Sequence, residues 1–387
     1  MFRIRHYDDY DEAVLEWRRL GLPRDFIDRR RMLGTVFAYA DSIDPAEAQR
    51  LQKIVKAQGA EGLICQKLGG RTLLIAAPPS FFEKMSIEPG ELGATAEQMS
   101  AALRNFSARH TLPWKLPDRD LRLDRTLVMG ILNLTPDSFH DGGAHGKDAV
   151  AHALQMVEAG ADIIDIGGES TRPGASPVTP EAELARVLPV LEGLSARTEV
   201  PLSIDTRHWQ VAKAAAAAGA SIVNDISGLR DPAMRRVVAE NRLGAVVMHM
   251  RGTPADMQAD TRYQDMMGEI FAFLRTQIEV AAADGIVPAS LVLDPGIGFS
   301  KSPEGNVELL RRLREFRSMG LPVLVGASQK AFLGKVQGDM AASRLEGSLA
   351  AATIAVQNGA SIVRAHDIRA TRAAVRLADA VAGRISL

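Results

Sequence analysis

From residue 127 onward, polar side chains that can do chemistry stand at the ends of short apolar runs or just behind them. They are Asn133, Asp165, Asp205, Asn224, Asp225, His249, Asp294, Arg364, His366 and Asp367, with Ser328, Gln329 and Lys330 behind a further run. Carboxylates and amides after three of these runs, with a lysine after a fourth, suit a flat polar heterocycle that carries ring nitrogens and an amide. The residues predicted to hold such a ring are Asp205, Asn224, Asp294 and Lys330.

Arg364 and His366 are the strongest candidates for an anion site. A guanidinium fork with a second donor beside it suits an oxyanion. Barrels built from alternating strands and helices often hold phosphate behind their seventh and eighth strands, where these residues stand. The alternative is an arginine on the surface and a histidine at the start of a helix.

Some of these polar residues have a plainer interpretation, because Asp and Asn behind a strand often cap the next helix or close a turn. We assign Asp225 and Asp367 mainly to such roles. Asp165 stands inside an apolar run, so a buried structural carboxylate is an alternative there. His249 is interpreted as a satisfied structural group in preference to a ligand.

The apolar runs themselves predict the fold. Eight of them alternate with amphipathic segments, at residues 127–132, 162–166, 201–204, 221–224, 244–249, 291–294, 322–326 and 361–364. The span is close to the roughly 250 residues of an eightfold β/α barrel, whereas an open doubly wound sheet more often has five to seven strands. We therefore predict an α/β protein with a (β/α)8 TIM barrel at residues 121–387, whose strand ends form one mouth.

The first 120 residues lack this rhythm and predict a separate small α/β domain of unknown role. Candidate strands lie at 35–40, 62–65 and 72–77, and candidate helices at 44–59 and 95–108. The stretch from 110 to 125, with two prolines and many charges, is predicted to be a linker that ends in a hairpin.

Composition narrows the class of protein. Lys and Arg number 46 against 47 Asp and Glu, a net charge of -1, so the long-range attraction of a nucleic-acid or membrane-surface binder is absent. The single cysteine excludes an intrachain disulfide framework and a cysteine-rich metal cluster. The first residues contain no signal-peptide core, and no run is long enough for a membrane span. We expect a soluble, cytoplasmic protein.

Two long stretches resemble the signatures of the dihydropteroate synthase family. LVMGILNLTPDSFHDGG at 127–143 resembles the first signature, and DIIDIGGESTRPGA at 162–175 resembles the second. Shorter stretches agree in order and spacing: SIDTR, IVNDISG, VVMHMRGTP, LDPGIGF, GASQKAFLG and VRAHD. The resemblance covers residues 127–387.

The resemblance implies an enzyme of folate synthesis. It would condense 6-hydroxymethyl-7,8-dihydropterin pyrophosphate with p-aminobenzoate to give 7,8-dihydropteroate and pyrophosphate, with Mg²⁺ present. The resemblance also implies that the chain forms a homodimer.

The resemblance also assigns roles to matching residues. The pterin would contact Asp205, Asn224, Asp294 and Lys330, and pyrophosphate would contact Asn133, Arg172, Arg364 and His366, with Asn133 close to the metal. The catalytic residues would be Asp205, Lys330, Arg364 and His366. Mobile loops with Asp141 and Arg172 would complete a p-aminobenzoate pocket made by Phe139, Thr171, Pro173, Phe299 and Ser328.

Two departures from the family pattern keep alternatives open. Gln329 stands where the family usually has arginine, so a cationic group near the p-aminobenzoate end is missing. The long segment 1–120 is associated in some synthases with flavin-dependent dihydropteroate reduction, but it has no GxGxxG or P-loop pattern. We prefer a dimerisation or barrel-capping module there and do not predict a flavin.

Two rival functions share the pterin site. A methyltetrahydrofolate:corrinoid methyltransferase needs no pyrophosphate site, so the Arg364 and His366 pair favours the synthase. A catalytically silent pterin-binding paralogue would bind the pterin but form no dihydropteroate.

Overall fold

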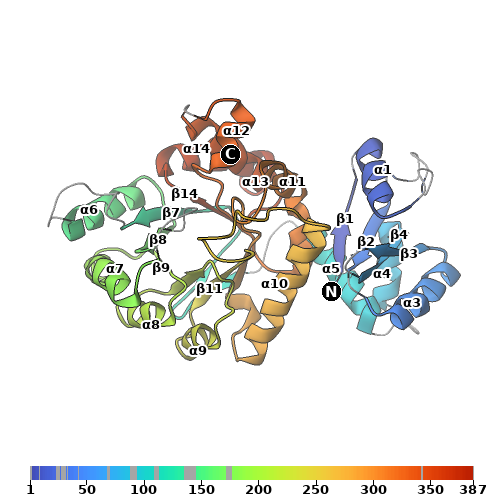
Figure 1. Cartoon of the computed structure of the whole chain (residues 1–387), viewed down its shortest axis with the longest axis horizontal. Coiled ribbons are helices and arrows are strands. Elements are labelled where there is room, and N and C mark those ends of the chain that lie inside the picture. The colour runs from blue at the N-terminus through green and yellow to red at the C-terminus, as the bar shows by residue number, and fades with distance from the viewer. Residues whose placement is uncertain are drawn as a thin grey trace. The chain divides into compact units, whose positions relative to one another are not determined.

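The structure, a computed structural model, describes residues 2–386 apart from 8, 23–26, 28–31, 33, 42, 68–69, 88–93, 109–112, 135–144, 171–176 and 341–342. The chain forms two compact units (Figure 1). The first comprises Met1–Arg109, Gln264–Arg275 and Arg314–Gly320, and the second comprises His110–Tyr263, Thr276–Leu313 and Leu321–Leu387. The boundary predicted at residue 120 stays a prediction.

The second unit is built on eight parallel strands. They are β7 (Leu127–Asn133), β8 (Ile163–Gly167), β9 (Leu202–Asp205), β10 (Ile222–Asp225), β11 (Gly244–Met248), β12 (Leu291–Asp294), β13 (Leu324–Val325) and β14 (Ile362–Ala365). Their order is β12-β11-β10-β9-β8-β7-β14-β13. A parallel bridge between Leu293 and Val323 brings the two end strands together. The predicted TIM barrel is therefore confirmed, and each strand overlaps one of the eight apolar runs.

Helices connect successive strands and lie around them (Figure 1). They are α6 (His145–Glu158), α7 (Pro180–Ser195), α8 (Trp209–Ala217), α9 (Pro232–Glu240), α10 (Met266–Ala283), α11 (Pro303–Arg312), α12 (Ala331–Gln337), α13 (Leu345–Gln357) and α14 (Ile368–Val381), with 3-10 turns at Pro288–Ser290 and Leu313–Met319. The first part of α10, up to Arg275, and the turn from Arg314 onward belong to the first unit. The starts of α7, α9 and α11 share one device. Thr179, Asp231 and Ser302 each accept a hydrogen bond from the first turn, and proline follows. Such caps fix where these helices begin, and so where the preceding loops end.

The barrel interior changes from apolar to polar along the strands. Because side chains alternate along a strand, every second residue points inward. The lower layer is an apolar cluster that includes Met129, Ile163, Ile222, Val246, Val292, Leu324 and Ile362. Further along the same strands the inward positions carry Asn133, Asp205, Asn224, Asp294 and Arg364. The predicted polar ring therefore stands on an apolar floor.

A hairpin packs into the apolar end of the barrel, within the segment predicted as a linker. It pairs β5 (Trp114–Lys115) with β6 (Asp120–Leu121). Trp114 is fully buried, and its Nε1 donates to Ser290 O at 2.7 Å. A side chain at Gly244 would collide with Leu116 and approach Trp114 to 3.1 Å. Glycine at the start of β11 therefore makes room for the hairpin.

The first unit contains a four-stranded antiparallel sheet, as part of the small α/β domain predicted there. Its order is β1 (Arg3–Arg5), β2 (Val36–Ala40), β4 (Gly70–Ala77) and β3 (Glu61–Lys67). Its helices include α1 (Tyr10–Arg19), α3 (Pro45–Ala57), α4 (Pro79–Ile87) and α5 (Ala94–Ser107). The three predicted strands and two predicted helices are present. β1, α1 and α4 were not predicted.

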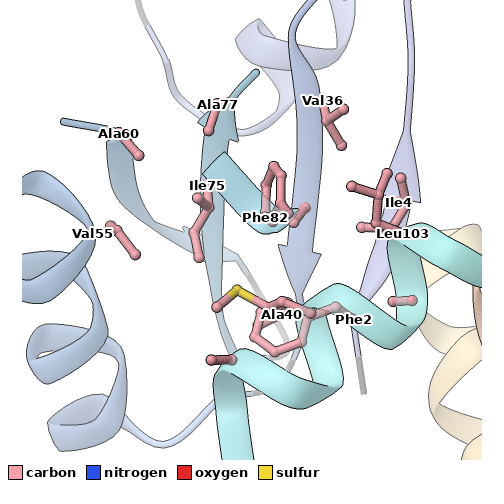
Figure 2. Packing of buried hydrophobic residues seen from close by; sticks show 14 of the residues in the cluster. Phe2, Ile4, Val36, Ala40, Val55, Ala60, Ile75, Ala77, Phe82 and Leu103 are labelled. Atoms are coloured by element: carbon pink, nitrogen blue, oxygen red, sulfur yellow. The ribbon is translucent and has the colours of Figure 1, made fainter. Parts of the chain in front are cut away.

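Both faces of this sheet are buried. On one face, Val55, Ile75 and Phe82 belong to a cluster with the inner sides of α3, α4 and α5 (Figure 2). On the other face, Trp17 of α1 packs in a cluster with Tyr39 and neighbouring side chains. Alternate residues of β4 enter the two cores, which explains its unbroken apolar run. Among the described helices, none is both long and apolar enough to cross a membrane.

Candidate active site

Strand register brings three of the predicted site residues into one row. Asn133 on β7 pairs with Gly167 on β8, Gly167 pairs with Asp205 on β9, and Asp205 pairs with Asn224 on β10. A Cβ at Gly167 would lie 3.6 Å from Asp205 Oδ2 and 3.7 Å from Asn133 Oδ1. The glycine therefore leaves room between an amide and a carboxylate at the polar end of the barrel.

Arg364, on β14, contacts Asp205 of this row. Its Nε donates to Asp165 Oδ2 at 2.6 Å, and its Nη2 donates to Asp205 Oδ2 at 2.7 Å. Asn224 Nδ2 also donates to Asp165 Oδ2, at 2.9 Å. Asp165 is fully buried and links β8, β10 and β14. The residue for which a buried structural role was one alternative thus lies within the predicted site.

The two carboxylates keep acceptors to spare. Asp165 Oδ1 and Asp205 Oδ1 are buried and have no hydrogen-bond partner among the described residues. Burial raises the pKa of Asp205 to about 7, with the Asp165 and Glu183 carboxylates adding to the rise and the charges of Arg364 and Lys330 opposing it. A buried acceptor without a donor is costly, so this pair is suited to a ligand that brings N–H groups.

The charge of Lys330 acts on the carboxyl of Asp294. Burial raises the pKa of Asp294, while hydrogen bonding to Gly296 N and the charges of Lys330, Lys301 and Arg364 oppose the rise. Its Oδ1 accepts from Gly296 N at 2.7 Å. The Lys330 Nζ lies 4.0 Å from the centre of the Phe299 ring. The lysine therefore lies over an aromatic face, and its charge acts on the Asp205 and Asp294 carboxyls.

The loops after β13 and β14 are tied to each other. Ser328 Oγ lies 3.0 Å from His366 Nδ1 and accepts from His366 N at 3.2 Å. Gln329 has a left-handed backbone, with φ at +60°, and its Nε2 donates to Asp367 Oδ2 at 3.1 Å. The predicted anion-site histidine is consequently oriented by a residue predicted to line the p-aminobenzoate pocket.

The two aspartates assigned to caps or turns differ in outcome. Asp225 accepts from Ser227 N at 2.7 Å, Ser227 Oγ at 2.8 Å and Leu229 N at 2.9 Å, which confirms its turn role. Asp367 precedes α14 but makes no side-chain cap there. The capping assignment of Asp367 was wrong, because its carboxylate pairs instead with the Gln329 amide.

Five predicted residues fall outside the described part of the chain: Phe139, Asp141, Thr171, Arg172 and Pro173. Their positions stay predictions. These residues lie in the segments 135–144 and 171–176, and the structure describes the residues that flank the second segment. Glu169 Oε1 accepts from Val178 N at 3.1 Å, and both Glu169 oxygens accept from Arg207 at 2.9 Å. Sequence reasoning missed this clamp, although Glu169 and Arg207 stand inside quoted motifs.

His249 and Lys301 form a buried pair, of which only His249 was singled out from the sequence. His249 was interpreted as a structural group, and its Nδ1 lies 3.1 Å from Lys301 Nζ. Lys301 was not singled out, because a lone lysine behind a glycine-rich loop carries no sign of burial.

The magnesium ion implied by the resemblance would find one amide ligand, that of Asn133, in the part of the chain that the structure describes. Among the described residues, no group of three or more His, Cys, Asp or Glu side chains could hold a metal. Asn133 offers a half-buried amide at the end of β7. Mg²⁺ commonly takes one or two protein ligands and completes its shell with phosphate oxygens and water. Asn133 fits that mode.

Comparisons with known proteins identify the family of the chain. Residues 129–366 match the pterin binding enzyme family. Dihydropteroate synthase of Escherichia coli K12 is 47% identical over 262 residues, which are 67% of this chain and 93% of that protein. A probable bifunctional folylpolyglutamate synthase/dihydropteroate synthase of Halobacterium salinarum is 44% identical over 391 residues, covering 96% of this chain and 46% of that protein.

Solved structures agree. A Yersinia pestis dihydropteroate synthase with a sulfonamide drug complex is 43% identical with a TM-score of 0.67, covering 70% of this chain and 100% of that one. A Xanthomonas albilineans dihydropteroate synthase with 4-aminobenzoic acid is 45% identical with a TM-score of 0.66, covering 70% and 98%. The chain belongs to the pterin-binding enzyme family. Within that family its place is among the dihydropteroate synthases, enzymes of folate biosynthesis.

Proposed function

We propose that the protein condenses 6-hydroxymethyl-7,8-dihydropterin pyrophosphate with p-aminobenzoate, giving 7,8-dihydropteroate and pyrophosphate. The observation that carries the proposal is the Arg364 bridge between Asp165 and Asp205, set in one row with Asn133 and Asn224. Related structures hold 4-aminobenzoic acid or were determined in the presence of pteroic acid.

The pterin fits the buried acceptors. Its ring N–H groups would donate to the vacant oxygens of Asp165 and Asp205, and Asn224 and Asp294 would continue the edge. Lys330 would donate to the pterin carbonyl. Polar groups that are desolvated and unpaired before binding reward a ligand that pairs them and reject one that cannot.

The reaction separates charge, because the carbon–oxygen bond breaks before the new bond forms. Its electron pair leaves with pyrophosphate, and positive charge develops on the pterin methylene carbon. The ionised Asp205 would stabilise that cation. The p-aminobenzoate nitrogen then attacks the carbon, and its proton passes to the released pyrophosphate or to water, so no covalent enzyme intermediate is required.

Arg364 and His366 would receive the leaving group. The Arg364 Nε and one N–H of Nη2 already donate to carboxylates, so the remaining N–H groups on Nη1 and Nη2 are the donors that would reach pyrophosphate. The contact of His366 with Ser328 fixes the orientation of its ring. Mg²⁺, held in part by the Asn133 amide oxygen, would supply Lewis-acid stabilisation of the pyrophosphate charge.

The p-aminobenzoate ring would lie against Phe299 and Ser328, which the structure describes as buried. Phe139, Thr171 and Pro173 would complete the pocket, with Asp141 and Arg172 on the loops that cover bound pyrophosphate. Gln329 stands where the family usually has arginine, and its side-chain amide donates to Asp367. The p-aminobenzoate carboxylate would therefore lack that cationic partner.

We further propose that the chain forms a homodimer. Large apolar side chains are exposed on α13 and α14, at Ile354 (46%), Leu377 (66%) and Val381 (71%). Pairing such a face between two copies would remove it from water. Light scattering coupled to gel filtration tests the mass.

An assay of pyrophosphate release with and without p-aminobenzoate tests the function. We expect release that depends on the amine, together with dihydropteroate detected by mass spectrometry. The silent-paralogue alternative predicts pterin binding by calorimetry and no product with both substrates and Mg²⁺.

A further inference from the structure

Lys301 is a buried amine that the proposed chemistry does not use. It lies between β12 and α11, and its residue is 3% exposed. Its Nζ lies 2.9 Å from Phe299 O, 3.1 Å from His249 Nδ1 and 3.4 Å from His249 O. An ammonium has three N–H donors, so each finds an acceptor here. The acceptors belong to two loops, because His249 directly follows β11.

This contact sets the tautomer of His249. An ammonium only donates, so the His249 Nδ1 must accept and the ring proton lies on Nε2. Burial lowers the pKa of His249 well below its ordinary value, and the charges of Lys301, Arg230 and Arg251 lower it further. The ring is therefore neutral, with Nε2 as its donor.

The two loops touch through their backbones. Gly296 has a φ of +74°, and a Cβ there would collide with the carbonyl oxygen of His249 and lie 3.2 Å from Lys301 Nζ. Arg251 N donates to Ser300 Oγ at 3.0 Å. Lys301 thus stands at the meeting point of the loops and binds a carbonyl from each.

The residues it grips lead directly to the site. Phe299, whose carbonyl accepts from Lys301, places its ring 4.0 Å from Lys330 Nζ. Phe299 packs in one apolar cluster with Met248 and Met250, the two neighbours of His249. A shift of either carbonyl would therefore move this apolar wall and the aromatic face beside Lys330.

We propose that Lys301 is a positioning residue of the active site, whose ammonium fixes the Phe299 ring and the Met248 and Met250 wall by binding the carbonyls of Phe299 and His249. The proposal rests on the proposed function for its substrates. Lys301 touches no substrate and acts through Phe299. An apolar residue would fill the same space but would remove the donor that His249 Nδ1 and the two carbonyls share, leaving Phe299 O with Ser300 Oγ at 2.8 Å. Burial lowers the pKa of Lys301 to about 7, so the amine is the charged donor of this contact below that pH.

The first test reads the contact without activity. In the wild-type full chain below about pH 7, where Lys301 is charged, ¹⁵N NMR of labelled histidine should show His249 as the neutral Nε2–H tautomer. The Lys301→Met variant should lose that preference, while Lys335→Met, an exposed lysine on α12, should keep it. A wild-type His249 protonated on Nδ1 would overturn the proposal even if the variant fails to fold.

The second test separates positioning from general stability. Lys301→Met should raise the KM for p-aminobenzoate about tenfold, with a smaller change in kcat, because the lost hydrogen bonds shift a binding surface. Combined with Phe299→Leu, its effect on KM should be much smaller than the sum of the two single effects. Additive effects, or an unchanged KM in a folded variant, would overturn the proposal. A wild-type chain that forms no dihydropteroate defeats the proposed function instead, and the NMR result still stands alone.

Discussion

Asp205 combines burial with charge in a way that serves the proposed reaction. Its carboxylate lies beside Asp165 in the barrel and is held by one guanidinium, that of Arg364. Burial raises its pKa to about 7, so the charge that would stabilise a cation is costly to hold. Charge kept in a site without water acts strongly on a nearby developing charge.

Replacing Asp205 with asparagine should separate binding from turnover. The amide still accepts a hydrogen bond from the pterin, but it carries no charge. We expect kcat to fall by about a hundredfold or more, with a much smaller change in pterin affinity by calorimetry. Asp231→Asn, at the start of α9, is the control and should leave kcat unchanged. Unchanged turnover in the Asp205 variant would defeat the assignment.

The same carboxyl predicts the acid limb of the pH profile. Because the charged form is the active one, kcat/KM should fall as the pH drops below about 7, the pKa to which burial raises Asp205. The limb should be absent from the residual activity of Asp205→Asn. Histidine and carboxyls with a raised pKa titrate between about pH 5 and 8. A wild-type profile that is flat over this range would contradict the prediction.

The contribution of Asp205 to stability should fall as the pH rises, whereas its contribution to activity should increase. The pKa of Asp205 is raised in the folded protein, so the native state keeps a proton that the unfolded state has lost above its ordinary pKa of about 3.9. This contribution to stability is present at low pH and is lost as the pH rises towards about 7. Relative to wild type, the Tm of Asp205→Asn should therefore increase with pH over this window. A constant difference in Tm would show that the carboxyl has no raised pKa.

At the scale of elements, parallel register does most of the assembly. Asn133, Asp205 and Asn224 are far apart in sequence, yet adjacent strand ends bring them into one row. The loop ends are then tied by side chains, such as Glu169 with Arg207 and Val178. The strands place the groups, and these ties fix residues beside the segment that is predicted to complete the site.

The Glu169 clamp should matter for p-aminobenzoate. It joins residues on both sides of the segment that carries Thr171 and Pro173, which are predicted to line that pocket. Glu169→Gln should raise the KM for p-aminobenzoate about tenfold, because a charge-assisted pair becomes a weaker one. Glu181→Gln, on the exposed side of α7, is the matched control. Equal KM values in steady-state assays of both variants would exclude this role.

The barrel could be predicted from sequence because its strands are apolar runs followed by polar residues or glycine. β1 escaped prediction, since Arg3 and Arg5 flank its single apolar residue and both are buried. Lys301 and Asp165 were not assigned to the site for a related reason. Sequence gives the residue type, whereas burial and partners come from other strands and loops.

At the scale of the whole molecule, the two units have separate cores. The alignment with the Escherichia coli relative covers 67% of this chain, whereas the alignment with the Halobacterium salinarum relative covers 96% and so extends into the first 120 residues. The proposed chemistry involves residues of the second unit alone. The first unit should therefore be open to destabilisation without loss of the reaction.

Phe82→Ala tests that independence. Phe82 is fully buried in the first core (Figure 2), and its removal should cost about 3–5 kcal/mol of that unit's stability. Hydrogen exchange should speed up in β2 and β4 and stay unchanged in β7 to β10, with kcat/KM within about twofold. Leu15→Ala, at an exposed site on α1, should change neither. Equal loss of protection in both units would show that they unfold together.

A crystal structure with a pterin pyrophosphate analogue and p-aminobenzoate tests the central claim most directly. The account predicts one chamber, with the pterin edge on Asp205, Asn224, Asp294 and Lys330 and the diphosphate beside Arg364 and His366. A structure in which Lys330 and Arg364 face separate regions of solvent, with the pterin bound to only one of them, would contradict it.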